Sequence, residues 1–191
     1  MTFKDRQIEV EELKGEQVRD ERFVSCRFAG AKLKFSSFTK CIFENCDFTG
    51  VLLESTSFEE CRFPGSKLSN LDFAPAVFIK CDFRESVIEN SVFQHIKTGT
   101  KDEVVRYDLR ECLFEGATLQ NTIFIKCDFA GVTFSKTKLA GAMFDRCKLT
   151  KTKFDEADIS GVNFEGSIID QTELDYQGFV QYGNSRGFKL C

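Results

Sequence analysis

Nine cysteines and a single histidine are the residues of this 191-residue chain most able to do chemistry. Thiolates and imidazoles bind zinc, and a thiol beside a histidine can act as a nucleophile. The spacing supports neither use. The shortest cysteine interval, Cys41 to Cys46, is five residues, and His95 has no second histidine with which to share a metal. Phosphate-binding glycine motifs are also missing from the sequence. An enzyme would need a cleft and a titrating residue that this pattern does not supply, so we expect no catalysis and no cofactor.

A column of large apolar residues dictates where these groups must lie. Every fifth residue from Phe23 to Phe93 is large and apolar, and the spacing resumes from Leu109 to Leu174. Nineteen of the 22 phenylalanines fall in this column or in its extension back to Phe3. Each such side chain is expected in the interior, where burial contributes on the order of 1.5–3 kcal/mol. The core phenylalanines expected from this pattern include Phe43, Phe48, Phe63, Phe83, Phe124 and Phe129.

A second column, two residues before the first, consists mostly of small residues. Leu71 and Tyr107 are its clear misfits. Free cysteine behaves as a small hydrophobe, so we expect the thiols in this column to fill the core. Eight of the nine cysteines belong to it: Cys26, Cys41, Cys46, Cys61, Cys81, Cys112, Cys127 and Cys147.

A five-residue period fits neither an α-helix nor a strand of period two. It fits a coil that turns a corner every five residues, so that four sides close a square turn of 20 residues. Stacked turns pair their backbones at roughly 4.7–4.9 Å, which makes about seven turns a rod roughly 35 Å long. No turn buries its own faces, so the stability of the rod must come from stacking.

Segments such as 41–45 (CIFEN), 46–50 (CDFTG) and 157–161 (ADISG) resemble the pentapeptide-repeat family, whose pattern is small, polar, Leu or Phe, polar, Gly or polar. The resemblance covers roughly residues 22–174. It implies an all-β fold, a right-handed quadrilateral β-helix with one projecting loop and a short C-terminal cap. We therefore expect a single domain over residues 1–191, with regular repeats at 22–93 and 109–174.

The first break in the pattern is the N-terminal segment, residues 1–21. Phe3, Ile8, Leu13 and Val18 keep the apolar spacing. The small-residue column, however, would hold charged side chains, which cannot be buried without partners. We expect an irregular coil or a cap over the open end. The residues that would occupy the small column are Met1, Arg6, Glu11, Glu16 and Glu21.

The second break is the segment 94–108, where the frame slips. Phe93 and Leu109 are 16 residues apart, which fits one repeat unit plus eleven extra residues or two units plus six. Loops on a rigid scaffold often carry binding residues, although a tolerated surface insertion would look the same. We expect a partner-binding loop formed by His95, Lys97, Lys101, Asp102, Glu103 and Arg106.

The third break is the C-terminal segment, residues 175–191, which is aromatic and off the pattern. A short helix or strand there would cover the last open coil. An end so rich in Phe and Tyr could also join two rods tail to tail. The residues expected at such a dimer contact are Leu174, Tyr176, Phe179, Tyr182 and Phe188.

The net charge of −4 argues against direct nucleic-acid binding, which needs a basic surface. Acidic side chains recur at outward positions with cations between them, either as a mixed solvated face or as an anionic stripe. No 18-residue apolar run or secretory leader is present, so we expect a cytoplasmic protein with no membrane contact.

The layout is similar to that of the quinolone-resistance (Qnr) proteins within this family. The supporting stretches are 13–18, 23–28 and 174–177, together with the mid-rod insertion. The resemblance implies a DNA-mimicking homodimer, joined at the C-terminal ends, that binds DNA gyrase or topoisomerase IV and protects it from quinolones or a related toxin. The alternative is a structural or adaptor solenoid with an unrelated protein partner.

Overall fold

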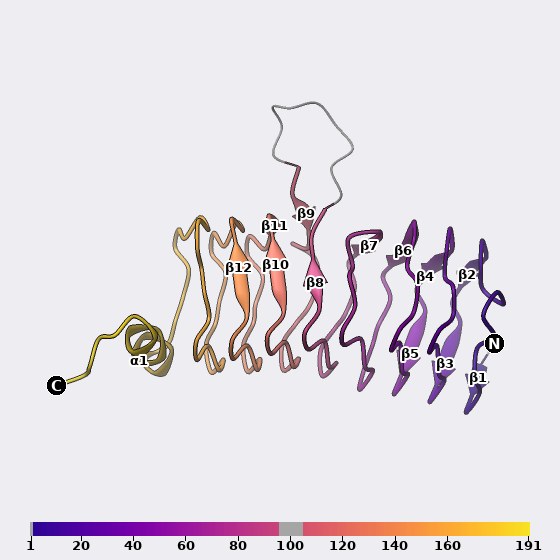
Figure 1. Cartoon of the computed structure of the whole chain (residues 1–191), viewed down its shortest axis with the longest axis horizontal. Helices are drawn as coiled ribbons and strands as arrows, with labels where there is room; N and C mark the ends of the chain where they lie inside the picture. Colours follow the sequence, from indigo (N-terminus) through magenta and orange to yellow (C-terminus); the bar gives the residue numbers. More distant parts are fainter. Residues whose placement is uncertain (1, 96–104) are drawn as a thin grey trace.

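The computed structural model describes residues 2–95 and 105–191. Its backbone winds into a rod of stacked coils, with the first coil at one end and helix α1 at the other (Figure 1). All pairings between strands are parallel, as they must be when one coil follows the next in the same direction. The fold is thus the four-sided β-helix that the five-residue period predicts, with the right-handed coil that the resemblance to pentapeptide repeats implies. No helix in the described ranges is both long and apolar enough to cross a lipid bilayer.

The elements are short because each side of the square leaves room for only a few extended residues. In the described ranges they are β1 (Thr2–Lys4), β2 (Gln17–Arg19), β3 (Arg22–Val24), β4 (Ser37–Thr39), β5 (Ile42–Glu44), β6 (Thr56–Glu59), β7 (Ala76–Ile79), β8 (Val92–Phe93), β9 (Tyr107–Asp108), β10 (Ile123–Ile125), β11 (Cys127–Asp128), β12 (Met143–Asp145) and α1 (Tyr176–Ser185).

Residues one coil apart pair across the ladder at an interval of 20. Phe23 pairs with Phe43, and their rings stack with centroids 5.0 Å apart and an angle of 9° between planes. Neighbouring sides of the square meet edge to face, as Phe43 and Phe48 do at 5.3 Å and 72°. Both geometries are preferred by aromatic pairs. The phenylalanines and cysteines expected in the core are buried.

The small-residue column has a second role besides fitting a narrow space. The thiol of Cys46 donates to the carbonyl oxygen of Phe23 at 3.4 Å, from one coil to the previous one. The Ser66 hydroxyl makes the equivalent bond to Phe43 at 2.6 Å. The column therefore favours small side chains that also carry a hydrogen-bond donor.

That geometry explains the charges in the first coil. Residues 2–20 are irregular only in part: β1 pairs in register with β3 and β2 with β4, whereas residues 10–15 form a turn that has no bridge to the next coil. A small-column side chain points toward the coil before it, and the first coil has none. Arg6, Glu11 and Glu16 accordingly lie in solvent, without the burial that charges avoid.

At most corners between two sides, one residue in every five adopts a positive φ, in the left-handed region of backbone conformation. Gly50 has φ of +69°, which costs glycine nothing, while Asn45 adopts +51° as one of the few other residue types that tolerate it. These corners set the five-residue period.

The frame slip adds eleven residues to one coil. Asp82 pairs with Leu113, and Val87 with Thr118, so the interval rises from 20 to 31 and the coil then continues. Of the two arrangements that the spacing allowed, this is one repeat unit plus eleven residues. The extra length lies between β8 and β9, because β8 pairs with β10 while β9 pairs with β11.

Candidate interaction surfaces

One side of the rod is interrupted beside the insertion. Its strands form two separate sheets, β2-β4-β6-β7 and β9-β11, and within the described residues no strand pairs with the second edge of β7. The other sides continue past this level, as the pairing of Asp82 with Leu113 shows. Figure 1 shows β9 separated from β7 along the rod, with β11 close beside β9.

Tyr107 spans the interruption. It occupies the small-residue column, and its phenol donates to the carbonyl oxygens of Ala76 at 2.7 Å and Phe73 at 3.3 Å. Like the thiols and hydroxyls of this column, Tyr107 donates a hydrogen bond to a carbonyl oxygen of the preceding coil. Its side chain, however, is far longer than that of cysteine. The phenol is buried, and burial raises the pKa of Tyr107 well above its ordinary value. Tyr107 therefore acts as a neutral spacer that holds β9 away from β7.

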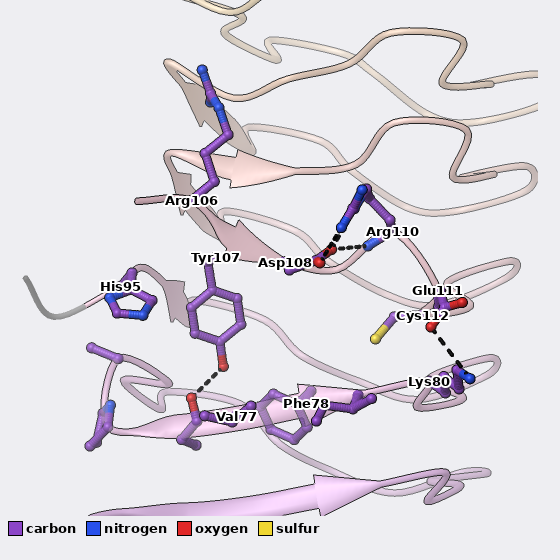
Figure 2. Close-up of a pocket in the computed structure, with 14 residues that line it drawn as sticks. Val77, Phe78, Lys80, His95, Arg106, Tyr107, Asp108, Arg110, Glu111 and Cys112 are labelled. Atoms are coloured by element: carbon purple, nitrogen blue, oxygen red, sulfur yellow. Dashed lines mark hydrogen bonds and ion pairs between the residues drawn. The ribbon is translucent and has the colours of Figure 1, made fainter. Parts of the chain in front are cut away.

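The space left by this spacer is an open pocket of about 750 Å³ (Figure 2). Val77 and Ile79, on the outer surface of β7, are 51% and 45% exposed at its floor. Tyr107 descends from β9 toward β7 in the close-up. The remaining lining combines both signs of charge: His95, Lys80, Arg106, Asp108, Arg110 and Glu111.

Most charges in the pocket are paired with one another. Arg110 donates two hydrogen bonds to the Asp108 carboxylate, at 2.9 and 2.6 Å, and lowers the pKa of Asp108. Lys80 lies 3.7 Å from Glu111. Arg106 instead donates to the backbone carbonyl of Arg146 at 2.7 Å. Among the described side chains, that is the pocket cation without a carboxylate beside it.

Two of the residues expected in the partner-binding loop fall at this pocket. His95 is exposed, and its ring lies edge-on to Tyr107 with centroids 6.5 Å apart. Arg106 also lines the pocket, and its side chain points away from β7 toward the carbonyl of Arg146 (Figure 2). Lys97, Lys101, Asp102 and Glu103 lie outside the described residues. The sequence prediction omitted Tyr107 and β7, although the misfit of Tyr107 in a column of small residues was a usable signal.

The C-terminal end of the rod carries helix α1. Asp175 caps it by accepting a hydrogen bond from the Gly178 amide at 2.7 Å, as N-cap residues do. Gln181 accepts from the Ile159 amide at 2.9 Å, and Tyr182 packs on Phe164 with ring centroids 5.9 Å apart. These contacts attach the helix to the last coil.

The helix covers that coil only in part. Tyr176 and Phe179 are 70% and 62% exposed, and Phe188 beyond the helix is 73% exposed. Leu174 is half-buried beneath them. An apolar hollow of about 210 Å³ remains, lined by Leu149, Phe154, Phe164, Ile169, Leu174, Phe179 and Tyr182.

Charges on the rod pair from coil to coil. Lys148 lies 3.7 Å from Asp128, and Lys153 lies 3.1 Å from Glu173, in each case one coil apart. Exposed pairs of this kind contribute little to stability, about 0–1 kcal/mol each. The last coil differs, because residues 154–185 contain seven carboxylates and no lysine or arginine. Negative charge therefore gathers at the C-terminal end.

The buried cysteines form packed columns rather than a reactive site. Cys41, Cys61, Cys81 and Cys112 occupy the same side of successive coils, and all are free and buried. Burial raises the pKa of Cys46 and of Cys112 to about 12. The described residues contain no cluster of three or more His, Cys, Asp or Glu that could hold a metal ion.

Comparison with known proteins agrees with this architecture. A family model described as "Pentapeptide repeat region" matches residues 17–97 and 106–174. A trypsin-treated variant of QnrB1, a plasmid-mediated fluoroquinolone resistance protein, superposes with a TM-score of 0.67 at 16% identity, covering 100% of this chain and 98% of that one. Full-length QnrB1 gives 0.66 at 19% identity, with 93% and 87% covered. A search of curated proteins finds no match. At these identities the structural likeness shows the fold.

Proposed function

Because this chain belongs to the pentapeptide-repeat family, we propose that it is a non-catalytic, DNA-mimicking protein that binds DNA gyrase or topoisomerase IV and protects it from quinolones or a related toxin. The observation that carries the proposal is the whole-length match to QnrB1, which covers both chains from end to end rather than a few coils. QnrB1 is a fluoroquinolone resistance protein, and we extend that role to this rod.

The acidic last coil supplies the electrostatics that a DNA mimic needs. A basic DNA channel attracts a surface of concentrated negative charge, and complementary potentials raise association rates. Residues 154–185 hold seven carboxylates and no lysine or arginine of their own, and Glu173 alone among them is paired in the structure, with Lys153, among the described ion pairs. The coil-to-coil ion pairs along the rest of the rod make those coils a weaker attractant.

Dimerisation through the C-terminal end is part of the same proposal. Phe179 and Tyr176 expose apolar rings beside the hollow over the last coil, and a two-fold contact would bury both sets of rings. Two acidic coils would then meet at the centre of a rod of double length. The dimer would present one continuous anionic band.

The test is a gyrase supercoiling assay with purified protein, with and without a fluoroquinolone. We expect the wild-type protein to restore supercoiling in the presence of drug. A variant with Glu156→Gln, Glu165→Gln and Asp170→Asn should lose that rescue. The matched control, with Glu54→Gln, Glu59→Gln and Glu60→Gln in the other half of the rod, should keep it.

Other outcomes distinguish the alternatives. Inhibition of gyrase without rescue from the drug would indicate a DNA competitor that gives no protection. No effect of micromolar protein on gyrase or topoisomerase IV would contradict the proposal and favour an adaptor that binds an unrelated protein. Deleting residues 96–106 tests the insertion separately. The deletion should alter protection while leaving the rod folded.

A further inference from the structure

We propose that the gap between β7 and β9 binds a compact, flat, uncharged heterocycle with the edge of a cyclic imide, which is the chemistry of a uracil-type base. The free edge of β7 holds that ring through backbone groups, beside the exposed side chains of Val77 and Ile79. Small-molecule sites usually measure roughly 300–1,000 Å³. This pocket, at about 750 Å³, falls in that range. The inference does not depend on binding to a topoisomerase.

The first argument is the shape of the gap, which is closed at both ends. At one end the Tyr107 phenol donates to the carbonyl oxygen of Ala76 at 2.7 Å. At the other end the Leu113 amide donates to the carbonyl oxygen of Cys81 at 3.0 Å, and the regular ladder has resumed. Between these contacts no described strand pairs with the outer edge of β7. A gap bounded in this way admits a compact molecule and excludes a chain that runs through it.

The second argument is the set of backbone groups that line the gap. The Glu60 amide donates to the carbonyl oxygen of Ile79 at 2.8 Å, so Ile79 bonds toward β6. Neighbouring residues of a paired strand direct their backbone groups to opposite sides. The amide and carbonyl of Phe78 and the amide of Lys80 therefore face the gap, and none of them has a hydrogen-bond partner in the described part of the chain. Along this edge the groups run donor, acceptor, donor.

The coils on either side show why these groups are left over. One coil earlier, the carbonyl oxygen of Phe58 accepts from the Cys81 thiol at 3.3 Å. The equivalent thiol, that of Cys112, lines the pocket and has no such bond to Phe78 among the described contacts (Figure 2). A continuous ladder would direct the Arg110 amide to Phe78, but that amide donates to a neighbouring carboxylate at 3.1 Å. The coil beyond the gap is thus satisfied without β7.

The third argument concerns charge. The lining cations Lys80 and Arg110 already have carboxylates beside them, at 3.7 and 2.6 Å. Arg106 points away from β7 and donates to the carbonyl oxygen of Arg146 at 2.7 Å. Among its described side chains, the gap therefore has no lysine or arginine left for an anionic ligand. The occupant is an uncharged molecule that is recognised by polar atoms along one edge.

A cyclic imide matches these features. Its edge presents carbonyl oxygen, N–H and carbonyl oxygen in order, which complements the donor, acceptor and donor of Phe78 and Lys80. The ring is flat, so it fits in the plane of the sheet where a strand is missing. Val77 and Ile79, which are 51% and 45% exposed, provide apolar contact at the rim. A site whose polar groups depend on the ligand for partners discriminates strongly against an analogue that lacks one of them.

The probe for the test is 1-methyluracil, which keeps the imide edge and blocks the other ring nitrogen. Its matched control is the isomer 3-methyluracil, in which the methyl group replaces the hydrogen of the imide nitrogen. Amide chemical shifts of the intact, isotope-labelled protein are the readout. We expect 1-methyluracil to shift the Phe78 and Lys80 amides and to bind at least tenfold more tightly than 3-methyluracil. The Lys40 amide, which is paired with Glu59 at the equivalent corner two coils earlier, should not shift.

Protein variants test whether the gap is the site. Tyr107→Cys restores the usual small residue, allows β9 to approach β7, and should weaken binding of 1-methyluracil at least tenfold. Tyr176→Cys, at an exposed position on helix α1, is the matched control and should bind like the wild-type protein. Circular dichroism checks that both variants are folded.

Uridine separates two sources of the same ring. Binding of uridine as tight as that of 1-methyluracil would assign the site to nucleosides, whereas loss of binding would assign it to the free base.

Three results would overturn the proposal. They are equal binding of the two methyluracils, unchanged binding by a folded Tyr107→Cys variant, and no shift of the Phe78 and Lys80 amides at millimolar 1-methyluracil. None of these measurements contains gyrase or topoisomerase IV. A failed supercoiling assay therefore leaves the inference standing, and its own failure leaves the proposed function standing.

Discussion

In the wall of the rod, the Cys61 thiol lies 3.4 Å from the carbonyl oxygen of Phe38, one coil earlier. Ser66 holds the same relationship to Phe43, and Thr152 to Phe129 at 2.9 Å. Many residues at this position thus combine a small volume with a hydrogen-bond donor, while others, such as Ala31 and Ala76, have only the small volume. Cysteine, serine and threonine satisfy both, which accounts for an unusual cysteine content in a chain whose thiols are all free.

Substitutions at Cys61 should separate those two properties. Cys61→Ser keeps the donor and the size, so we expect the free energy of unfolding to change by less than about 1 kcal/mol. Cys61→Leu overfills a site with no exposed surface and should cost about 1–3 kcal/mol. Urea denaturation measures both. Equal stability of the two variants would show that the column tolerates volume.

In the native protein, we expect only the C-terminal thiol to react with a thiol-specific reagent. Eight cysteines are buried and Cys191 is exposed. We expect a thiol-specific reagent at neutral pH to modify one cysteine per native chain and nine after denaturation. Rapid modification of a second thiol would contradict the buried columns.

The same thiols make stability depend on alkaline pH. Burial raises the pKa of Cys46 and of Cys112 from an ordinary value near 9 to about 12. Between these values the unfolded chain releases protons that the folded chain keeps, so folding loses stability as the pH rises. We expect the free energy of unfolding to be constant with respect to these groups below about pH 9 and to decline toward pH 12. Denaturation at several pH values, with a Cys46→Ala and Cys112→Ala variant, checks the slope.

Tyr107 should contribute to stability through its hydroxyl. Tyr107→Phe leaves the ring in place and removes the donor to Ala76 and Phe73, which we expect to cost about 1–3 kcal/mol because buried carbonyls lose a partner. Tyr176→Phe is the control, since that side chain is 70% exposed. Thermal unfolding that is the same for both variants would contradict the role of Tyr107 as an anchored spacer.

The proposed dimer contact at the C-terminal end can be tested by placing a charged residue in it. Phe179→Asp places a carboxylate on an exposed ring position beside the apolar hollow, where a dimer would bury it at a high desolvation cost. Analytical ultracentrifugation should show a monomer for this variant and a dimer for the wild-type chain. Phe35→Asp, at an exposed position far from that end, should leave the dimer intact. A monomeric wild-type chain would exclude the proposed assembly.

Deleting the insertion should restore a regular rod. Removal of residues 96–106 places His95 next to Tyr107 and returns Leu109 to a five-residue step from Phe93. Combined with Tyr107→Cys, the deletion should close the ladder between β7 and β9 and raise the melting temperature. Tyr107→Cys alone, with the insertion present, is the comparison. A lower melting temperature for the combined variant would show that the insertion itself stabilises the rod.

The β-helix was predictable because the sequence pattern that specifies it is contained in each five-residue unit. Each five-residue unit repeats the same large and small residues, and stacking follows from that repetition without any long-range guess. The fold and the family prediction were confirmed on this basis. The charges in the first coil were harder to interpret, because sequence alone does not show that small-column side chains point toward the preceding coil. Arg6 fits a regular coil once that direction is known, because the next residue, Gln7, pairs with Arg27, whereas Glu11 lies in an exposed turn.

The gap beside the insertion was not predictable from the spacing. The separation of 16 positions from Phe93 to Leu109 left two arrangements, and the pairing of Asp82 with Leu113 distinguishes them. The exposed edge of β7 depends on how far the Tyr107 phenol reaches, a three-dimensional property of one side chain. A repeat pattern shows where a unit deviates, but the distance between coils comes from packing.

The charged first coil also determines how far such rods can assemble. Solenoids with two apolar ends can join head to tail without limit and grow into fibres. Here the N-terminal end exposes Arg6, Glu11 and Glu16, while apolar rings are exposed at the opposite end. Growth by repeated addition requires both ends to be adhesive. If two chains meet at their C-terminal ends as proposed, their charged first coils would face solvent, which favours a pair over a fibre.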